Sequence, residues 1–399
     1  MVSENLPDGW RKVIFTDVID INRRLTIQKG TPSSFIEMKA VPEHQRKVAY
    51  TEIRSYTSGT KFKNGDTLFS RITPCTENGK TAFCDVLGQN EIGFGSTEFL
   101  VFSAKESTTD SKFIYYLSRF EPLRKYAIAN MTGTSGRQRV PKDAFEKLFI
   151  ALPSLSEQQK IASILSGLDD KIELNNKMNK TLEEIAKTLF KSWFVDFEPF
   201  QDGEFEKSEL GMIPKGWSVQ NLVNFADVQY GFAFKSKLFN SEKKGRPLIR
   251  IRNLKKYSSD TYTEEICDDK YLIEAGDIVV GMDGDFTSYF WQGKTSLLNQ
   301  RVMKLSSKQS KNQVFLFIAS ELLFKFEEQT KVGTTVIHLG KNDVDNMRLI
   351  IPNDEIMNQF NSVVNPLFSQ MITNTHQTQA LSKIRDTLLP KLISGDLAV

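Results

Sequence analysis

The chain has 399 residues and a mass of 45.5 kDa, and its 40% hydrophobic and 25% charged residues are typical of folded domains, with enough length for two or three of them. Lys and Arg number 52 and Asp and Glu number 49, so the formal charge of +3 does not indicate a nucleic-acid ligand unless the basic residues are concentrated locally. No apolar run approaches the ~20 residues of a membrane helix, and the first ten residues lack the pattern of a signal peptide. Three cysteines and three histidines are too few to indicate a disulfide framework or a metal site, and so sparse a cysteine content suits a reducing cytoplasm. Since no membrane helix is indicated either, we expect a cytoplasmic protein without a membrane partner.

An internal repeat organises the chain. The first half opens with LPDGW (6–10) and the second with IPKGW (213–217). Each half continues to a Gly-Asp turn, at Gly65-Asp66 and at Gly276-Asp277, and the apolar residues after each turn predict a buried strand. The last part of each half aligns without gaps at an offset of 199 residues, so that Pro153 matches Pro352. The sequence therefore predicts a duplicated domain with pseudo-twofold symmetry.

Each half ends in a segment with helical periodicity. Apolar residues recur at a/d-like spacing from 161 to 193 and again from 360 to 392. Each helix must bury one stripe, and the simplest partner for each is the other helix, in an antiparallel pair. Asn175 and Asn374 lie near the middle of the two stripes. We hypothesise that they meet and fix the register, as buried polar pairs do; the alternative is that both are exposed.

The predicted fold class is α+β. Two similar mixed α/β domains are separated by two long helices that pack as an antiparallel coiled coil. The expected boundaries are a first domain over 1–153, a first helical spacer over 154–196, a polar linker over 197–212, a second domain over 213–352 and a second helical spacer over 353–399.

The chain resembles the specificity subunit of type I restriction–modification systems. The resemblance rests on the two domain openings, on GDTLFSR (65–71) and GDIVVGMDGD (276–285), on GSTEFLVF (95–102) and LLNQRVMKL (297–305), and above all on IALPSLSEQQKIASILSGLDDKI (150–172). It implies that each globular half is a target recognition domain that reads one half of a split double-stranded DNA target. It also implies that the helices dock two methyltransferase subunits, which methylate adenine with S-adenosylmethionine, and that two motor-nuclease (restriction) subunits using ATP and Mg²⁺ complete the enzyme. This chain is then expected to be non-catalytic and to bind no cofactor itself.

The sequence agrees with a non-catalytic role. No Gly-rich loop for S-adenosylmethionine follows a strand, and no Gly-x-x-x-x-Gly-Lys-Ser/Thr loop for ATP is present. Two alternatives stay open: an orphan or phase-variable specificity chain that redirects an existing methyltransferase, and a self-contained nuclease or methylase.

Candidate DNA-reading residues fall into three groups, because base edges need Arg, Lys, Asn, Gln, Ser or Thr and phosphates need cations. The first group is the loop 132–139 with its counterpart 331–338; its candidates are Thr134, Arg137, Gln138, Arg139, Lys331, Thr334, Thr335 and His338. The alternative for both loops is a plain Gly turn.

The second group is Arg71 with nearby Lys80, where Arg71 either reaches DNA or forms a structural ion pair. The third group is Tyr230, Lys235, Arg250, Arg252 and Asn253. The alternation of Arg250 and Arg252 predicts two guanidinium groups on one face of a strand. The alternative there is a solvated edge strand protected by its charges.

Overall fold

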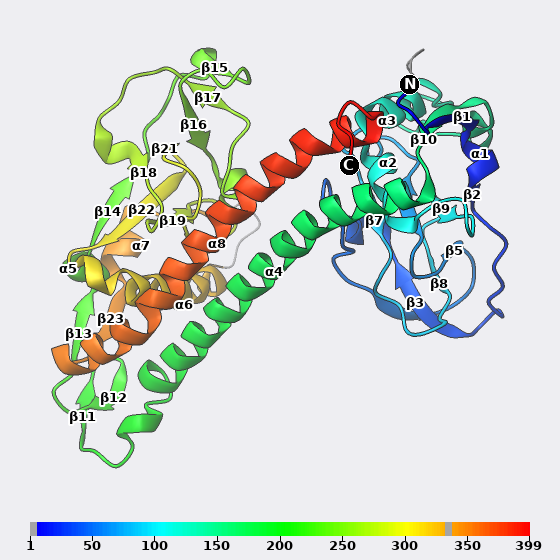
Figure 1. Cartoon of the computed structure of the whole chain (residues 1–399). Helices are drawn as coiled ribbons and strands as arrows, with labels where there is room; N and C mark the ends of the chain where they lie inside the picture. Colours follow the sequence, from blue (N-terminus) through cyan, green and yellow to red (C-terminus); the bar gives the residue numbers. More distant parts are fainter. Residues whose placement is uncertain (1–5, 332–336) are drawn as a thin grey trace. The chain divides into compact units, whose positions relative to one another are not determined.

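The computed structural model describes residues 6–331 and 337–399. It divides into two compact units (Figure 1). Unit 1 comprises the chain up to Ile172 together with Ala380–Val399, and unit 2 comprises Glu173–Gln379. The long helices α4 (Leu155–Phe194) and α8 (Asp354–Ser394) contribute residues to both units, so each unit holds one globular domain and one part of the helix pair. Among the described residues, no helix is both long enough and apolar enough to cross a membrane.

Unit 1 contains two four-stranded sheets and a short strand pair. The pair is β1 (Arg11–Ile14) with β10 (Phe149–Leu152), one sheet has the order β2-β9-β6-β7, and the other has the order β4-β3-β8-β5. The elements between β1 and β10 are α1 (Phe15–Val18), β2 (Ile19–Ile21), β3 (Pro32–Ile36), η1 (Met38–Ala40), β4 (Glu52–Ser55), β5 (Thr60–Phe62), β6 (Thr67–Ser70), β7 (Thr81–Phe83), β8 (Gly93–Gly95), β9 (Phe99–Ala104), α2 (Ser111–Arg119), α3 (Glu121–Ala129) and η2 (Lys142–Lys147).

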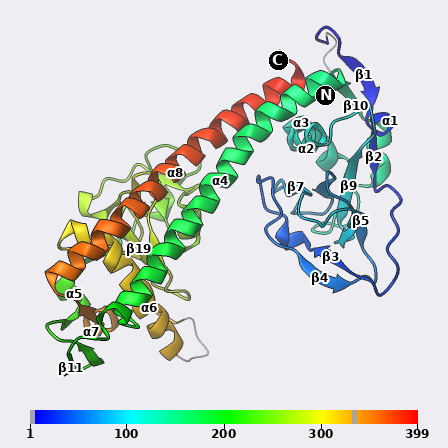
Figure 2. The ribbon, with the colours of Figure 1, turned by 60° about the horizontal axis from the view of Figure 1, so that its bottom comes forward.

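The main core of unit 1 lies between its first sheet, α2 and the helix pair. Figure 2 shows α2 and α3 between β9 and the first turns of α4. Phe102 of β9, Phe113 of α2, Ile161 of α4 and Leu392 of α8 belong to one buried cluster. The helix pair is therefore part of the domain core and not an appendage to it.

Unit 2 repeats this topology. The pair β13 (Ser218–Asn221) with β23 (Arg348–Ile351) corresponds to β1 with β10, the sheet β14-β22-β19-β20 corresponds to β2-β9-β6-β7, and a five-stranded sheet has the order β15-β17-β16-β21-β18. Its further elements are η3 (Glu198–Phe200), β11 (Phe205–Ser208), β12 (Gly211–Pro214), α5 (Leu222–Phe225), β14 (Ala226–Tyr230), η4 (Ser236–Leu238), β15 (Phe239–Asn240), β16 (Arg246–Ile249), η5 (Ile251–Lys256), β17 (Tyr262–Thr263), η6 (Asp269–Tyr271), β18 (Leu272–Ile273), β19 (Ile278–Gly281), β20 (Ser288–Phe290), β21 (Ser296–Leu298), β22 (Val302–Ser307), η7 (Ser310–Asn312), α6 (Gln313–Thr330) and α7 (Lys341–Asn346).

Equivalent residues perform equivalent local tasks in the two copies. Ser154 caps α4 by accepting a hydrogen bond from the Glu157 N–H at 3.3 Å, and Asn353, 199 residues later, caps α8 by accepting from the Ile356 N–H at 3.0 Å. The predicted fold class is confirmed at this level of detail.

The two long helices run antiparallel where they meet. In unit 2, Asn175 donates to the carbonyl of Asn374 at 3.4 Å, and Asn179 donates to the carbonyl of Met371 at 3.2 Å. Residue numbers rise along α4 as they fall along α8, which is the antiparallel arrangement expected from the repeat.

Candidate nucleic-acid interface

The candidate loop of unit 1 is tied to the chain that follows β6. The Val140 N–H donates to the Arg71 carbonyl at 2.8 Å, and the Thr73 N–H donates to the Gln138 carbonyl at 3.1 Å. Thr132 and Arg139 exchange backbone hydrogen bonds of 2.9 and 2.8 Å, which close the base of the loop. The structure therefore brings Arg71 together with Gln138 and Arg139, two groups that the sequence analysis listed separately.

Arg139 is held by a carboxylate. Its guanidinium makes a bidentate pair with Glu98, with Nε–Oε1 and Nη2–Oε1 distances of 2.9 and 2.6 Å. This hydrogen-bonded pair raises the pKa of Arg139 above its usual value. Arg139 therefore braces the base of the loop, and the tip, which includes Thr134 and Arg137, is exposed.

Arg71 is the less engaged cation of this site. Its backbone N–H donates to the Glu98 carbonyl at 3.0 Å, its side chain forms no ion pair within the described residues, and its buried Nε has no hydrogen-bond partner there. Lys80 lies close to Arg71, because the Lys80 carbonyl accepts a hydrogen bond from the N–H of the neighbouring Ser70 at 3.2 Å. The Lys80 ammonium, however, donates to the Met38 carbonyl at 3.2 Å. Arg71 is the better anion ligand of the two.

Unit 2 holds the same backbone arrangement with other side chains. The Leu339 N–H donates to the Met282 carbonyl at 2.8 Å, and the Met282 N–H donates to the Arg301 carbonyl at 3.0 Å. Met282, Arg301 and His338 thus take the places of Arg71, Glu98 and Arg139. His338 Nδ1 lies 2.7 Å from Asp283 Oδ1, and Arg301 Nε lies 3.5 Å from Asp283 Oδ2.

The remaining loop candidates of unit 2 are only partly placed. Thr334 and Thr335 lie outside the described residues. The ammonium of Lys331 lies 2.8 Å from Asp343 and 3.4 Å from Glu327, and the hydrogen bond to Asp343 raises the pKa of Lys331. Lys331 is therefore neutralised by its own domain.

The strand predicted for Arg250 and Arg252 is wrong. Strand β16 ends at Ile249, and Ile251–Lys256 is a 3₁₀ helix. The cause is local: the Asn253 side-chain oxygen accepts from the Arg250 N–H at 3.1 Å, and the Asn253 N–H donates to the Arg250 carbonyl at 2.8 Å, which closes a turn. Asn253 is buried by this task, and the two guanidinium groups do not share a strand face.

The arginines of this turn differ in their environments. The Arg250 guanidinium donates to the Thr261 hydroxyl and lies 6.0 Å from the Phe239 ring centroid, and burial lowers its pKa. Arg252 is exposed. Lys235 is also exposed, with its backbone N–H donating to Glu265 at 2.8 Å.

Tyr230 ends β14 and has a buried hydroxyl without a hydrogen-bond partner in the described residues. Burial raises its pKa, with further contributions from Asp345 and Asp343.

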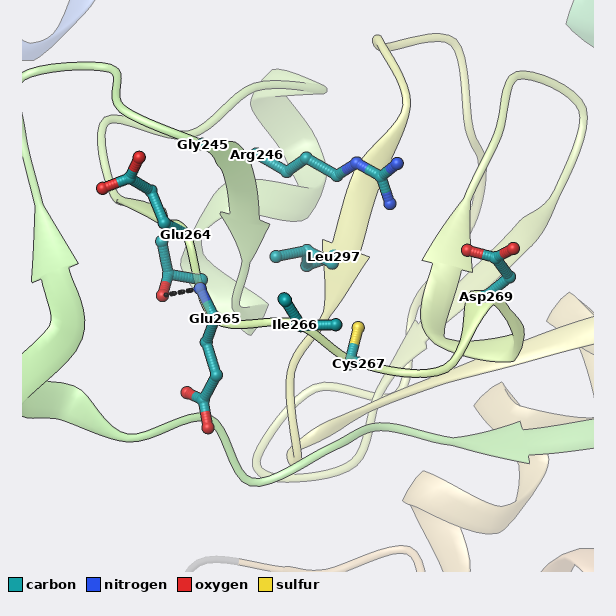
Figure 3. A pocket seen from close by; sticks show the side chains of 9 residues that line it. Gly245, Arg246, Glu264, Glu265, Ile266, Cys267, Asp269 and Leu297 are labelled. Atoms are coloured by element: carbon teal, nitrogen blue, oxygen red, sulfur yellow. Dashed lines mark hydrogen bonds between the residues drawn. The ribbon is translucent and has the colours of Figure 1, made fainter.

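A surface pocket lies at the start of strand β16, close in sequence to Arg250 (Figure 3). It has a volume of about 390 Å³, and its polar lining combines Arg246 with Glu264, Glu265 and Asp269. Three carboxylates against one guanidinium do not suit a phosphate. The pocket is therefore not an anion site.

The hypothesised contact between the helix asparagines is present in unit 2. Asn175 and Asn374 are buried, and Asn175 Nδ2 lies 2.9 Å from the Gln377 side-chain oxygen as well as 3.4 Å from the Asn374 carbonyl. The Asn374 amide donates to Asn179 Oδ1 at 2.8 Å. The polar cluster is thus wider than the predicted pair.

Comparisons with known proteins decide the family. The model of the type I restriction modification DNA specificity domain matches residues 7–184 and again 214–382. The chain belongs to this family. The specificity subunit of the type I restriction enzyme MjaIX from Methanocaldococcus jannaschii is 33% identical over 305 residues, which are 72% of this chain and 69% of that protein. The HindI specificity subunit of Haemophilus influenzae is 26% identical over 405 residues, covering 84% and 87% of the two chains.

A solved structure shares the fold of this specificity subunit. The S subunit of a type I restriction-modification system from M. genitalium covers 98% of each chain with a TM-score of 0.56 at 18% identity. The twofold match of the family model agrees with the internal repeat. The protein is thus a DNA-specificity subunit, which is a non-catalytic class of protein.

The sequence analysis missed the residues that hold the two loops of the specificity subunit. Glu98 and Arg301 stand at equivalent places, each directly before the strand β9 or β22. Both lie inside the segments GSTEFLVF and LLNQRVMKL, which carry the family resemblance. Their equivalent positions in the repeat are the sequence feature that could have identified them. Asp283 likewise lies within GDIVVGMDGD.

Proposed function

We propose that each recognition domain of this subunit reads one half of a bipartite DNA target. The observation that carries the proposal is the repeated backbone arrangement that flanks the two loops, in which Arg71, Glu98 and Arg139 are replaced by Met282, Arg301 and His338. A conserved frame with different side chains suits two readers of different sequences, because base edges are distinguished by side-chain donors and acceptors.

The proposed contacts differ in kind. Arg71 is assigned to a phosphate, and the exposed Thr134, Arg137 and neighbouring Gln138 are assigned to groove edges. In unit 2 the corresponding contacts are assigned to His338 and to the loop that includes Thr334 and Thr335, with Lys235 and Arg252 as additional cations. Arg139 is assigned a positioning role through Glu98.

We further propose that the helix pair docks two methyltransferase subunits. Apolar side chains are exposed on both helices: Ile164 and Ile384 in unit 1, and Ile185 and Val363 in unit 2. At the offset of 199 residues, Ile164 matches Val363 and Ile185 matches Ile384, so the repeat supplies two equivalent apolar surfaces. Two like surfaces suit two like subunits.

The chemistry is proposed to belong to those partners in the cytoplasm. Methyltransferase subunits with S-adenosylmethionine would modify adenine, and two motor-nuclease subunits with ATP and Mg²⁺ would cleave DNA. The proposed modules of this chain are the domains 1–153 and 213–352 and the helical spacers 154–196 and 353–399.

Domain exchange tests the reading role. Residues 1–153 are replaced by those of another specificity subunit, the chain is expressed with its methyltransferase, and the methylated sites in the host genome are mapped. One half of the methylated motif should change and the other should stay. A change in both halves would contradict independent reading.

Co-purification tests the docking role. The double substitution Ile164→Glu with Ile384→Glu should reduce the methyltransferase recovered with the tagged chain, whereas Ser163→Glu with Lys383→Glu, at adjacent exposed positions, should not. Recovery of methyltransferase without any restriction subunit from the native host would favour the orphan role. Methyl transfer or cleavage by the pure chain would refute the non-catalytic assignment.

A further inference from the structure

The helices α2 and α6 are equivalent elements of the two recognition domains. Phe113 and Ser118 of α2 match Phe315 and Ser320 of α6 at an offset of 202 residues. Both serines are buried and bond within their own helix, Ser118 to the Ile114 carbonyl at 2.7 Å and Ser320 to the Phe317 carbonyl at 2.9 Å. The next position is Arg119 in α2 and Glu321 in α6.

In unit 1, this position faces an acidic group on α8. Arg119 Nη2 lies 3.7 Å from Asp386 Oδ1. Beside this contact, Asp169 of α4 and Arg385 of α8 form a buried ion pair of 2.6 Å, and the Tyr116 hydroxyl donates to Asp169 at 2.7 Å. We call the surface of the two long helices on which a recognition domain packs its docking face, which is distinct from the proposed methyltransferase surface. The docking face of domain 1 holds an ionic network in which Asp169 and Arg385 are buried and Asp386 lies at the exposed edge.

In unit 2, every one of these charges is reversed or absent. At the offset of 199 residues, Asp386 corresponds to Lys187, and Lys187 Nζ lies 2.6 Å from Glu321. The buried pair of Asp169 and Arg385 corresponds to Phe368 and Ala186. Phe368 packs in an aromatic cluster, with ring centroids 5.6 Å from Phe317 and 4.8 Å from Phe290.

We infer that each docking face accepts only the recognition domain that packs on it in this chain. The face of unit 1 accepts domain 1 and excludes domain 2, and the face of unit 2 accepts domain 2 and excludes domain 1. A domain 1 on the face of unit 2 brings Arg119 against Lys187. A domain 2 on the face of unit 1 brings Glu321 against Asp386 and an apolar surface against the buried ion pair. Like charges disfavour both arrangements, and in the first of them Arg119, whose side chain is 5% exposed in unit 1, loses both of its carboxylate neighbours, Asp169 and Asp386. The inference concerns packing within the chain and does not depend on the DNA-reading role.

A full-length chimera tests the exclusion. Residues 213–352 are replaced by a second copy of 6–153, which sets Arg119 of the second copy against Lys187. The chimera is compared with one that also carries Ala186→Arg, Lys187→Asp and Phe368→Asp, which give the second face the residues of the first. We expect the added triple substitution to raise the midpoint of thermal unfolding of the chimera and to lower that of the natural chain. An unchanged or lower midpoint in the chimera would overturn the inference.

The natural chain supplies a second test that does not require the chimera to fold. Arg119→Glu and Asp386→Lys form one double-mutant cycle, and Glu321→Lys and Lys187→Glu form the other. In each cycle the double variant should lower the unfolding midpoint by less than the sum of its two single variants, because the charge pair is restored with reversed sign. Additive losses in both cycles would show that the charges do not select the partner face.

Discussion

Removal of Arg385 should destabilise unit 1 strongly. The side chain is 6% exposed, and its Nη1 lies 2.6 Å from Asp169 Oδ1, whose own side chain is 3% exposed. Burial alone would lower the pKa of Arg385, but the carboxylates of Asp169 and Asp386 outweigh it and raise the pKa. The substitution Arg385→Met leaves Asp169 buried without its main counter-ion, and breaking a buried pair in this way costs about 3–5 kcal/mol.

The remaining partners of Asp169 place the expected loss at the lower end of that range. The Tyr116 hydroxyl still donates to Asp169 at 2.7 Å, and Arg119 lies 3.9 Å away. We therefore expect a loss of about 3 kcal/mol, a large share of the ~5–15 kcal/mol that stabilises a typical domain. Asp169→Leu combined with Arg385→Met should recover part of this loss, because the buried carboxylate is removed together with its guanidinium, while Arg119 keeps Asp386 at 3.7 Å as a counter-ion. The Tyr116 hydroxyl left without its acceptor still costs about 1–3 kcal/mol.

Amide hydrogen exchange in the intact chain is the assay. Peptides from α2 and from residues 380–394 report opening of unit 1, and peptides from α6 serve as the internal reference. Lys383→Met, at an exposed position of the same helix, is the matched control and should leave exchange unchanged. The reasoning fails if Arg385→Met costs less than about 1 kcal/mol, or if the double variant is as unstable as the single one.

Three further predictions concern reading and register. Arg71→Ala should weaken DNA binding by the assembled complex and reduce the slope of log K against log salt by about 0.9, the value for one phosphate contact, and an unchanged slope would remove Arg71 from the phosphate contacts. Glu98→Gln should release Arg139 and relax sequence preference in one half of the target only, as measured by methylation of mismatched sites; equal relaxation in both halves would argue against it. Asn374→Leu removes the donor to Asn179 and should broaden the distribution of distances between spin labels on the two helices of unit 2, whereas an unchanged narrow distribution would show that the asparagines do not set the register.

The helices and the repeat could be predicted because their signals are periodic and local. Apolar spacing predicted α4 and α8, and the offset of 199 residues placed Asn175 and Asn374 at matching points of two antiparallel helices. Burial of one stripe per helix follows from the spacing of the apolar residues, since an amphipathic helix must cover its apolar face.

The side-chain partners could not be predicted in the same way. Glu98 is 41 residues from Arg139, and nothing in the local sequence indicates that the two meet. The strand expected at Arg250 is absent because of a local interaction. The Arg250 N–H donates to the side chain of Asn253, only three residues away, and this hydrogen bond favours a turn despite the alternation of residue types. Alternation describes which face a residue takes only after the backbone is known to be extended.

The two units differ in one way at the candidate DNA-reading loops and in another way at the docking faces, where the recognition domains pack on the helices. Beside the loops, the backbone hydrogen bonds of Arg71 are repeated at Met282 while the side chains change, which is what the proposed reading of two different DNA sequences would require of one frame. At the docking faces, Arg119 with Asp386 becomes Glu321 with Lys187, a change that leaves each pair attractive and alters only which partner is accepted. A difference in DNA target does not require this second change, because neither ion pair includes a loop residue. The charge reversal therefore has to be explained separately from DNA reading. Its geometry supplies one explanation, which is that each docking face selects its own recognition domain.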